Sequence, residues 1–396
     1  MRLILIFLSA TLTAQSLHFQ NSHTSESLRG VSTVSRQIAW ASGTHGTYLR
    51  TIDGGKTWDA AQVPNAGNLD FRAVIAFSAD EAFLLSAGPA DQSRIFHTID
   101  GGAHWQLQFT NTNPKGFFDS MVFWDPKHGI VLGDPIPDEN GKLKFEILLT
   151  DDGGESWHAM LSAQLPEALP GEGAFAASNS CIAILPGRPW KSGASAPRQP
   201  GENGGALAPD NLDPNIWFAT GGAAARVFHS ADRGQTWQVV DTPVLHGPES
   251  AGIFSIAFRN DRDGVVAGGD YKRPTFDGPN LAFTHDGGKT WAIAEVHPQA
   301  YFSAVAYDPK ITEQARAQWQ VQGKAELKRN PITSKPDSRQ RLFIVNPDFV
   351  YDFRPPRQPH RLAVKAKPAA TFNAVSPFPE GGALLVGAKG TIAVVP

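Results

Sequence analysis

Short apolar runs, most of them ending in glycine, alternate with polar turn sequences along almost the whole chain. Such runs occur at 38–43, 83–88, 130–133 and 265–268. Runs of this length, rich in β-branched and aromatic residues and bounded by Gly, Asp or Ser, are typical of strands. Each follows a segment that opens on an apolar residue and a variable one, as at 28–31 and 71–74. The pattern predicts an all-β protein.

One octapeptide, S/T-x-D-x-G-x-x-W, recurs five times, at 51–58, 98–105, 150–157, 230–237 and 284–291. An Asp at the start of a tight turn accepts hydrogen bonds from the following amides, and the Gly supplies the positive φ of the turn. The Trp then buries a large ring under the hairpin. We therefore assign structural roles to Asp53, Trp58, Asp100, Trp105, Asp152, Trp157, Asp232, Trp237, Asp286 and Trp291.

At these residues the sequence resembles the Asp-box (bacterial neuraminidase repeat) family, in which the boxes join the third and fourth strands of propeller blades. Seven units are recognisable, the last two without a box. The box Asp residues lie 47, 52, 80 and 54 residues apart, and the long interval contains an insertion at about 186–210. Without this insertion and a second one at about 308–340, each unit has about 46 residues, which suits a four-stranded blade.

The arithmetic predicts a single seven-bladed β-propeller. The seventh unit ends the chain after three strands, and residues around 16–20 offer the fourth. An N-terminal strand would then close the ring in the last blade, which removes exposed sheet edges.

Composition restricts the functional classes. A formal charge of −3 provides no field of one sign for nucleic acid. The single cysteine, Cys181, forms neither an intramolecular disulfide nor a Cys-based zinc site.

Residues 1–16 have one early positive charge, an apolar stretch and a small-x-small site, as in a signal peptide. We expect an exported, periplasmic or extracellular monomer with its propeller at 17–396 and no membrane span.

The two faces of the predicted propeller differ. The boxes and both insertions belong to one face. The inner-strand starts and the loops between second and third strands belong to the other, at the channel mouth. A predicted ring of inner-strand starts comprises Arg29, Arg72, Asp119, Ala176, Ser255, Ser303 and Asn373. The loops add His45, Asp91, Asp134, Arg226, Asp270, Tyr271, Lys272, Arg273, Asp348 and Lys389. Mixed charges at a concave mouth suit a small polar or anionic ligand or a peptide. The alternative is that these are ordinary solvated loop ends.

An enzyme is the competing hypothesis. Sialidases share Asp boxes and bind the substrate carboxylate with three arginines, which the resemblance would assign to Arg29, Arg72 and Arg226, with Asp270 and Tyr271 nearby. The early Arg-Ile-Pro segment of that family is absent. Two-carboxylate glycoside hydrolysis would need two of Asp119, Asp134 and Asp270 to meet. Zinc-helix, Walker and nucleophile-elbow motifs are also missing, so we assign no catalytic residue, metal or cofactor.

Over nearly the whole length after residue 16, the chain resembles propellers of the photosystem II stability/assembly factor type. The five boxes and units such as Leu28-Arg29-Gly30-Val31 carry this resemblance. It implies a binding chaperone for membrane protein assembly that uses an Arg-containing face. Our leading hypothesis is therefore a non-enzymatic propeller that binds a protein or peptide partner at the channel mouth. The alternative is a glycan-binding or glycan-cleaving propeller.

Overall fold

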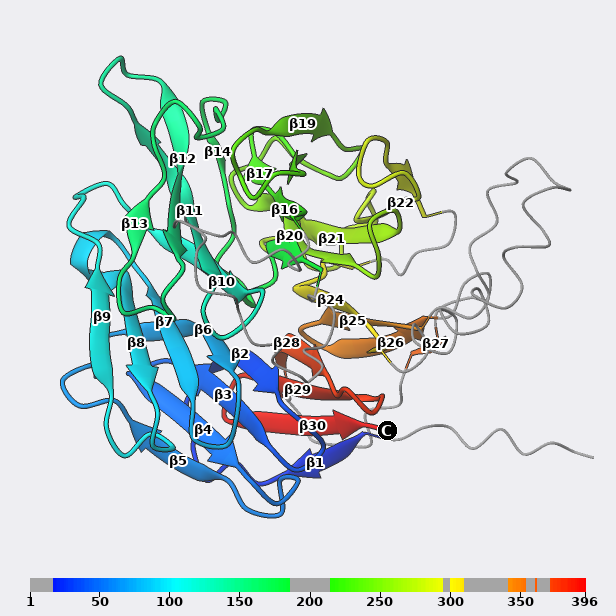
Figure 1. Ribbon diagram of the computed structural model, residues 1–396. Coiled ribbons are helices and arrows are strands. Elements are labelled where there is room, and N and C mark those ends of the chain that lie inside the picture. Colours follow the sequence, from blue (N-terminus) through cyan, green and yellow to red (C-terminus); the bar gives the residue numbers. More distant parts are fainter. Residues whose placement is uncertain (1–16, 186–213, 295–299, 310–340, 354–359, 362–370) are drawn as a thin grey trace, which may run out of the picture.

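Seven antiparallel sheets follow one another around a ring (Figure 1). The computed structural model describes residues 17–185, 214–294, 300–309, 341–353, 360–361 and 371–396. The blades follow one another in chain order, apart from the N-terminal strand β1 (His18–Gln20), which joins the last blade, and the short strands β14 (Glu172–Gly173) and β17 (Gly221–Gly222), which extend the fifth. The protein is thus a seven-bladed β-propeller, as the repeat predicts.

The first three blades are regular four-stranded meanders. Blade 1 consists of β2 (Leu28–Thr33), β3 (Ala39–Gly43), β4 (Thr47–Thr51) and β5 (Asp59–Gln62). Blade 2 consists of β6 (Asp70–Ala76), β7 (Ala82–Ala87), β8 (Arg94–Thr98) and β9 (Gln106–Thr110), with a short 3-10 helix η1 (Ala90–Gln92) before β8. Blade 3 consists of β10 (Phe118–Phe123), β11 (Gly129–Pro137), β12 (Leu143–Thr150) and β13 (His158–Ala159).

The next two blades share an irregular junction. Blade 4 consists of β15 (Ile182–Ile184), β16 (Ile216–Ala219), β18 (Arg226–Ser230) and β19 (Gln238–Asp241). Blade 5 consists of β20 (Ala251–Phe258), β21 (Gly264–Asp270), β22 (Leu281–Thr284) and β23 (Ala292–Ile293). Its sheet is extended past β20 by β17 (Gly221–Gly222) and β14 (Glu172–Gly173).

The last two blades complete the ring. Blade 6 consists of β24 (Ala304–Tyr307), β25 (Leu342–Asn346), β26 (Phe349–Phe353) and β27 (His360–Arg361). Blade 7 consists of β28 (Phe372–Pro377), β29 (Ala383–Gly387), β30 (Thr391–Val395) and the N-terminal β1 (His18–Gln20). The pairing of β1 with β30 confirms the predicted closure and is visible where blue meets red in Figure 1. The inner strands of the blades are β2, β6, β10, β15, β20, β24 and β28.

The hydrophobic core is divided among the blade interfaces. Seven clusters of buried side chains lie between successive blades, including one between blades 7 and 1. In that last cluster Leu28 and Trp58 of blade 1 pack with Leu384 and Ile392 of blade 7. Because every sheet buries both faces against its neighbours, each blade depends on the closed ring for its core.

One predicted strand is wrong. The apolar start at Phe175-Ala176-Ala177 suggested the inner strand of blade 4, but that strand is β15, and residues 174–181 have no regular structure. This segment instead crosses between several blades, as described below. The predicted signal peptide at 1–16 and nearly all of the insertions at 186–210 and 308–340 lie outside the described residues.

Candidate functional site

Each Asp box closes on itself through hydrogen bonds. In the first box, Thr51 Oγ1 donates to Asp53 Oδ1 at 2.9 Å and accepts the Gly55 amide at 2.9 Å. The Thr57 amide donates to Asp53 Oδ1 at 3.0 Å. Equivalent bonds recur in the other four boxes. The bonds from Thr57 lower the pKa of Asp53 to about 2. The box Asp is therefore engaged by its own turn.

The box of blade 2 also makes hydrogen bonds to another loop of its own blade and to the preceding blade. The box amide of Gly101 donates to the carbonyl of Asp80, in the loop between the first two strands of the same blade, at 2.9 Å. The next carbonyl, that of Gly102, accepts the Tyr48 hydroxyl of the preceding blade at 2.8 Å. The contact with Asp80 confirms that box and first loop share one face. Each fourth strand begins one residue after the box Trp, rather than at the Trp itself.

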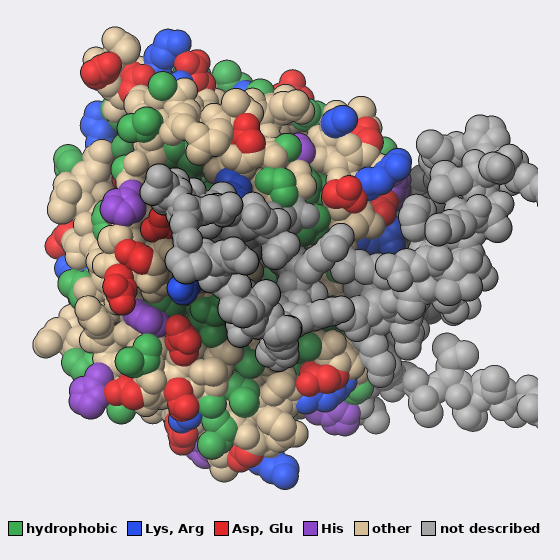
Figure 2. Space-filling model, viewed as in Figure 1, with side chains coloured by type: hydrophobic (Ala, Val, Ile, Leu, Met, Phe, Trp, Pro, Cys, Tyr) green, Lys and Arg blue, Asp and Glu red, His purple; other side chains and the backbone are tan. Residues whose placement is uncertain are grey.

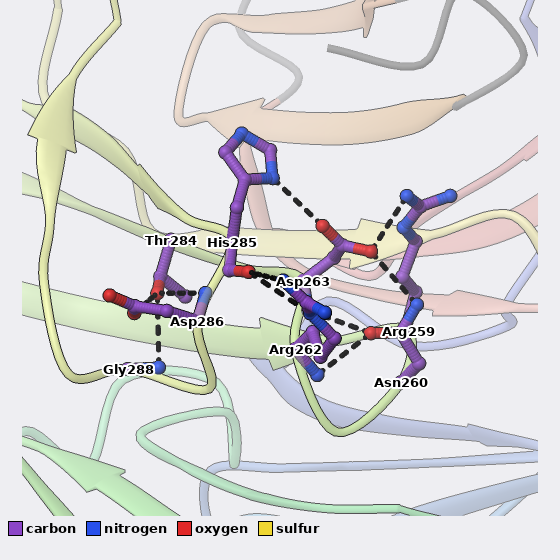
Figure 3. Close-up of polar contacts among 8 residues, drawn as sticks. All are labelled: Arg259, Asn260, Arg262, Asp263, Thr284, His285, Asp286 and Gly288. Atoms are coloured by element: carbon purple, nitrogen blue, oxygen red, sulfur yellow. Dashed lines mark hydrogen bonds and ion pairs between the residues drawn. The ribbon is translucent and has the colours of Figure 1, made fainter. Parts of the chain in front are cut away.

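The box of blade 5 carries additional charged contacts (Figure 3). Asp263, in the loop between β20 and β21, accepts from Arg259 Nη2 at 2.8 Å and lies 2.8 Å from Nδ1 of the box residue His285. Burial opposes ionisation of Asp263, but hydrogen bonds from His285 and Asn260 and the charge of Arg259 outweigh it, so its pKa falls to about 2. These contacts join the β20–β21 loop to the box.

On the opposite face, five of the seven inner strands contain a β-bulge. The register shifts near the start of β2, β6, β10, β20 and β28, which leaves one unpaired residue in each. These residues are Arg29, Arg72, Asp119, Phe254 and Asn373. Such bulges re-aim a side chain. The prediction of Ser255 at this ring position is wrong because Ile253 takes the buried place between blades 4 and 5, which makes Phe254 the bulged residue.

Five charged residues from blades 1 to 3 meet at the axis, and we call them the axial cluster: Arg29, Asp70, Arg72, Asp119 and Asp134. Arg72 Nε donates to Asp70 Oδ2 at 2.9 Å. Arg29 interacts electrostatically with both residues. Asp119 interacts with Arg72 and Asp134. The structure thus brings together four residues predicted at the channel mouth, Arg29, Arg72, Asp119 and Asp134.

The two inner carboxyl groups of the cluster are protonated more readily than usual. Asp119 is only 1% exposed, and burial together with the charge of Asp134 raises its pKa well above its ordinary value, against the effect of Arg72. Burial raises the pKa of Asp134 to about 6, although its Oδ1 accepts the Ala174 amide at 3.0 Å. Protonation of Asp119 leaves the positive charges of the cluster less compensated.

Arg29 is the cation of the cluster without a direct partner. Its Nε is buried and unbonded, and its guanidinium makes no hydrogen bond with any residue that the structure describes. Burial lowers its pKa below the ordinary value, while the charge of Asp70 opposes this. An unpaired, half-buried guanidinium is costly, and it offers its donors to an anionic or carbonyl group that arrives from outside.

Residues 174–181, which we call the axial segment, link blades across the ring. Ala176 O accepts from Arg72 Nη1 of blade 2 at 2.9 Å, and Ser178 Oγ donates to Ser303 O beside blade 6 at 2.9 Å. Asn179 bonds both the amide and the carbonyl of Met121 in blade 3. A ligand at this end of the axis would therefore meet an ordered backbone segment.

An aromatic row continues from the axial segment to the rim. Phe175 stacks on Phe254 with ring centroids 3.9 Å apart, and Phe254 makes edge contacts with Tyr301 at 4.8 Å and Tyr271 at 6.1 Å. Tyr301 in turn lies in the field of Arg29. Among these residues, sequence reasoning proposed only Tyr271 for the site. The small residue after each bulge, Ser255 in blade 5, is the signal that would have identified Phe254.

Two other predicted residues, Arg226 and Asp270, have partners of their own. Arg226 Nε donates to Glu172 Oε1 at 2.8 Å in a buried pair, apart from the axial cluster. Asp270 accepts from Ser250 Oγ at 2.7 Å and from Arg273 Nε at 2.7 Å, and these bonds outweigh burial and lower its pKa.

His45, on the β3–β4 loop, is exposed and lies 2.7 Å from Glu26, which raises the pKa of the imidazole. Lys272 is exposed beside Asp270, and within the described ranges its Nζ has no hydrogen bond or ion pair. On the face shown in Figure 2, acidic, basic and histidine side chains are interspersed, in keeping with the small net charge. Within the same ranges, no helix has the length and apolar character to cross a membrane.

Comparisons with known proteins agree with this architecture. The family model for the photosynthesis system II assembly factor YCF48 matches residues 11–114. The photosystem II assembly protein Ycf48 of Synechococcus sp. (strain JA-2-3B'a(2-13)) is 27% identical over 268 residues, covering 65% of this chain and 71% of the relative. The photosystem II assembly lipoprotein Ycf48 of Synechococcus sp. (strain CC9902) is 25% identical over 267 residues, covering 65% and 72%.

Solved structures support the fold alone. The GH74 xyloglucanase of Xanthomonas campestris superposes with a TM-score of 0.57 at 15% identity, covering 95% of this chain and 53% of that one. At this identity the likeness shows a shared propeller architecture and is no evidence of shared chemistry.

Proposed function

Because this chain is a seven-bladed Asp-box propeller similar to the photosystem II assembly factors, we propose that it is an exported, non-enzymatic binding protein. In this proposal it holds a segment of a protein partner at the axial end formed by the inner-strand bulges, in the manner of an assembly factor. The observation that carries the proposal is Arg29, a half-buried cation at this end with no bonded partner among the described residues.

Two further lines of reasoning support the proposal. The relatives are named as assembly proteins, and one of them as a lipoprotein, which fits a chain whose first 16 residues have the features of an export signal. Arg72 bonds the axial segment at Ala176 O, and Arg29, at the equivalent position of blade 1, interacts electrostatically with Arg72. An arginine fork beside ordered backbone suits a carboxylate or peptide group.

The arrangement of the carboxyl groups favours binding over glycoside hydrolysis. Asp119 and Asp134 do interact, which is the feature a two-carboxylate enzyme needs. However, Asp119 is almost fully buried, and the Ala174 amide occupies Asp134 Oδ1. Asp270 is bonded to Ser250 and Arg273. A substrate would have to displace these contacts to reach a reactive pair.

Site-specific photo-crosslinking in the cell envelope tests the proposal. A photoreactive residue at His45 samples the proposed face, and the same residue at the exposed Ile99 samples the opposite face as a matched control. We expect one peptide segment to crosslink reproducibly at position 45, not at 99, and to be lost with Arg29→Ala. Equal crosslinking at both positions, or no dependence on Arg29, would contradict the proposal.

The same preparation should be incubated with fluorogenic glycosides, including sialosides. We expect no turnover. Hydrolysis that disappears with Arg29→Ala would replace the binding proposal with the glycosidase alternative.

A further inference from the structure

The loop between β21 and β22, residues 271–280, exposes two aromatic rings at the rim of the proposed face. Tyr271 is 49% exposed and Phe276 is 39% exposed, and every residue from 271 to 277 is exposed. Large rings left in water on one short loop are not explained by core packing. Tyr and Phe of this kind are typical anchors of protein interfaces.

The loop is ordered by hydrogen bonds rather than by burial of its rings. Asp270 binds the Lys272 amide at 3.0 Å and the Arg273 side chain at 2.7 Å. The Phe276 amide donates to Arg273 O at 2.9 Å, and the Arg273 guanidinium lies 4.5 Å from the Phe276 ring centre. The rings are therefore held in place before a ligand arrives, which reduces the entropy lost on binding.

The exposed end of the loop is continuous with the axis. Tyr271 contacts the edge of Phe254, which is 3% exposed and packs against Tyr301. Tyr301 lies in the electrostatic field of Arg29 as well as of Tyr271. Buried packing through Phe254 and Tyr301 thus joins the exposed Tyr271 to the interior beside the axial cluster.

The charges near Tyr271 favour an acidic ligand. The Lys272 ammonium has no hydrogen bond or ion pair with the residues described here, whereas Arg273 is already paired with Asp270. The remaining loop carboxylate, Asp277, lies beyond Phe276 at the other end of the loop. A positive charge without a partner, next to an aromatic ring, complements a carboxylate that adjoins an apolar side chain.

We infer that Tyr271, Lys272 and Phe276, here called the aromatic rim, select the partner segment held by this propeller. The segment is an extended peptide in which an aromatic or large aliphatic side chain packs on Tyr271 and Phe276 and a neighbouring Asp or Glu pairs with Lys272. This inference rests on the proposed function and specifies its partner. A neutral sugar carries no charge to pair with the Lys272 ammonium, and the adjacent carboxylate of Asp270 is already occupied.

The test uses a display library of random linear peptides selected on the full-length protein. We expect enriched peptides to contain an aromatic or aliphatic residue next to Asp or Glu. The double variant Tyr271→Ser/Phe276→Ser should bind a selected, labelled peptide about tenfold or more weakly than the wild-type protein, since interface aromatic anchors contribute on this scale. Ile99→Ser, which removes an exposed apolar side chain from the other face, is the matched control and should bind as wild type.

A charge exchange tests the ionic part. Lys272→Glu should weaken binding of the acidic peptide. A peptide whose Asp or Glu is replaced by Lys should bind the Lys272→Glu variant but not the wild-type protein. The substituted residues Tyr271, Lys272 and Phe276 are all exposed, so thermal unfolding of the variants should match that of the wild-type protein.

The outcomes separate the two proposals. If the enriched peptides bind the rim variants normally but do not bind Arg29→Ala, the role inferred for the aromatic rim is wrong and the proposed function stands. Failure to enrich any peptide over an unrelated propeller would count against both. Tyr271-dependent binding of soluble oligosaccharides, without peptide binding, would overturn the peptide class.

Discussion

Arg226 and Arg29 lie on the same face of the sequence-predicted propeller, but the structure gives them opposite energetic roles. Arg226 is bonded to Glu172, whose side chain is fully buried and also accepts from Thr220 Oγ1 at 2.6 Å and from the Leu169 amide at 2.8 Å. Arg29 has no hydrogen bond among the described residues. We therefore expect removal of Glu172 to destabilise the fold and removal of the Arg29 charge to leave stability nearly unchanged.

The magnitude follows from the contacts. Glu172→Ala leaves the buried Arg226 guanidinium without its carboxylate and the Leu169 amide without its acceptor, which costs about 3–5 kcal/mol. Unfolding entropy is about 2 cal/mol/K per residue, so for the roughly 300 residues that the structure describes the melting temperature should fall by about 5–8 °C. Arg29→Gln removes an uncompensated charge and breaks no bond, so we expect a change within about 1 kcal/mol.

The assay is thermal unfolding of both variants by calorimetry at neutral pH, compared with wild type. Adding Arg226→Met to Glu172→Ala removes the stranded charge and should recover part of the loss, because the two sites are directly coupled. A loss below about 1 kcal/mol for Glu172→Ala, or above about 2 kcal/mol for Arg29→Gln, would refute the division into a structural and a binding arginine.

Three further predictions concern the scaffold. Gly102→Ala should lower the melting temperature and Gly67→Ala should not: Gly102 has φ of +90° and an added Cβ would lie 2.7 Å from the Tyr48 ring, whereas Gly67 has open space. Because Asp134 has a native pKa of about 6, above its unfolded value, stability should decline as pH rises from about 4 to 6, and Asp134→Asn should flatten that decline in pH-dependent unfolding. Asp263 has a native pKa of about 2, below its unfolded value, so stability should be lost as pH falls below about 4, and Asp263→Asn should reduce this acid sensitivity in the same assay.

Much of the fold was accessible from local patterns. The box Asp, for example Asp53, bonds to amides within the same octapeptide, so its role is encoded within eight residues. The insertion-corrected spacing predicted seven blades because each blade repeats one supersecondary unit. Blade 4 was misassigned at Phe175 because a single apolar start has the same appearance in a strand and in an irregular segment.

The candidate site was only partly predictable. Repeat position brought Arg29, Arg72 and Asp119 to one place, since equivalent positions of successive blades share one end of the axis. Their ionisation and partners depend on residues far away in the chain: Arg72 bonds Ala176, and Arg29 interacts electrostatically with Tyr301, only when the ring closes. The sequence therefore could not distinguish Arg29, which lacks a direct partner, from Arg226, which is paired.

By itself, then, the sequence determined what short-range periodicity encodes: strand-rich repeats, the turn chemistry of the boxes, the number of blades and the strand that closes them. The tertiary structure alone decided which of the polar residues at the axial end are satisfied and which remain available. The physical reason is that hydrogen bonding and desolvation are set by neighbours across the ring, and those neighbours are separated in the chain by up to several blades.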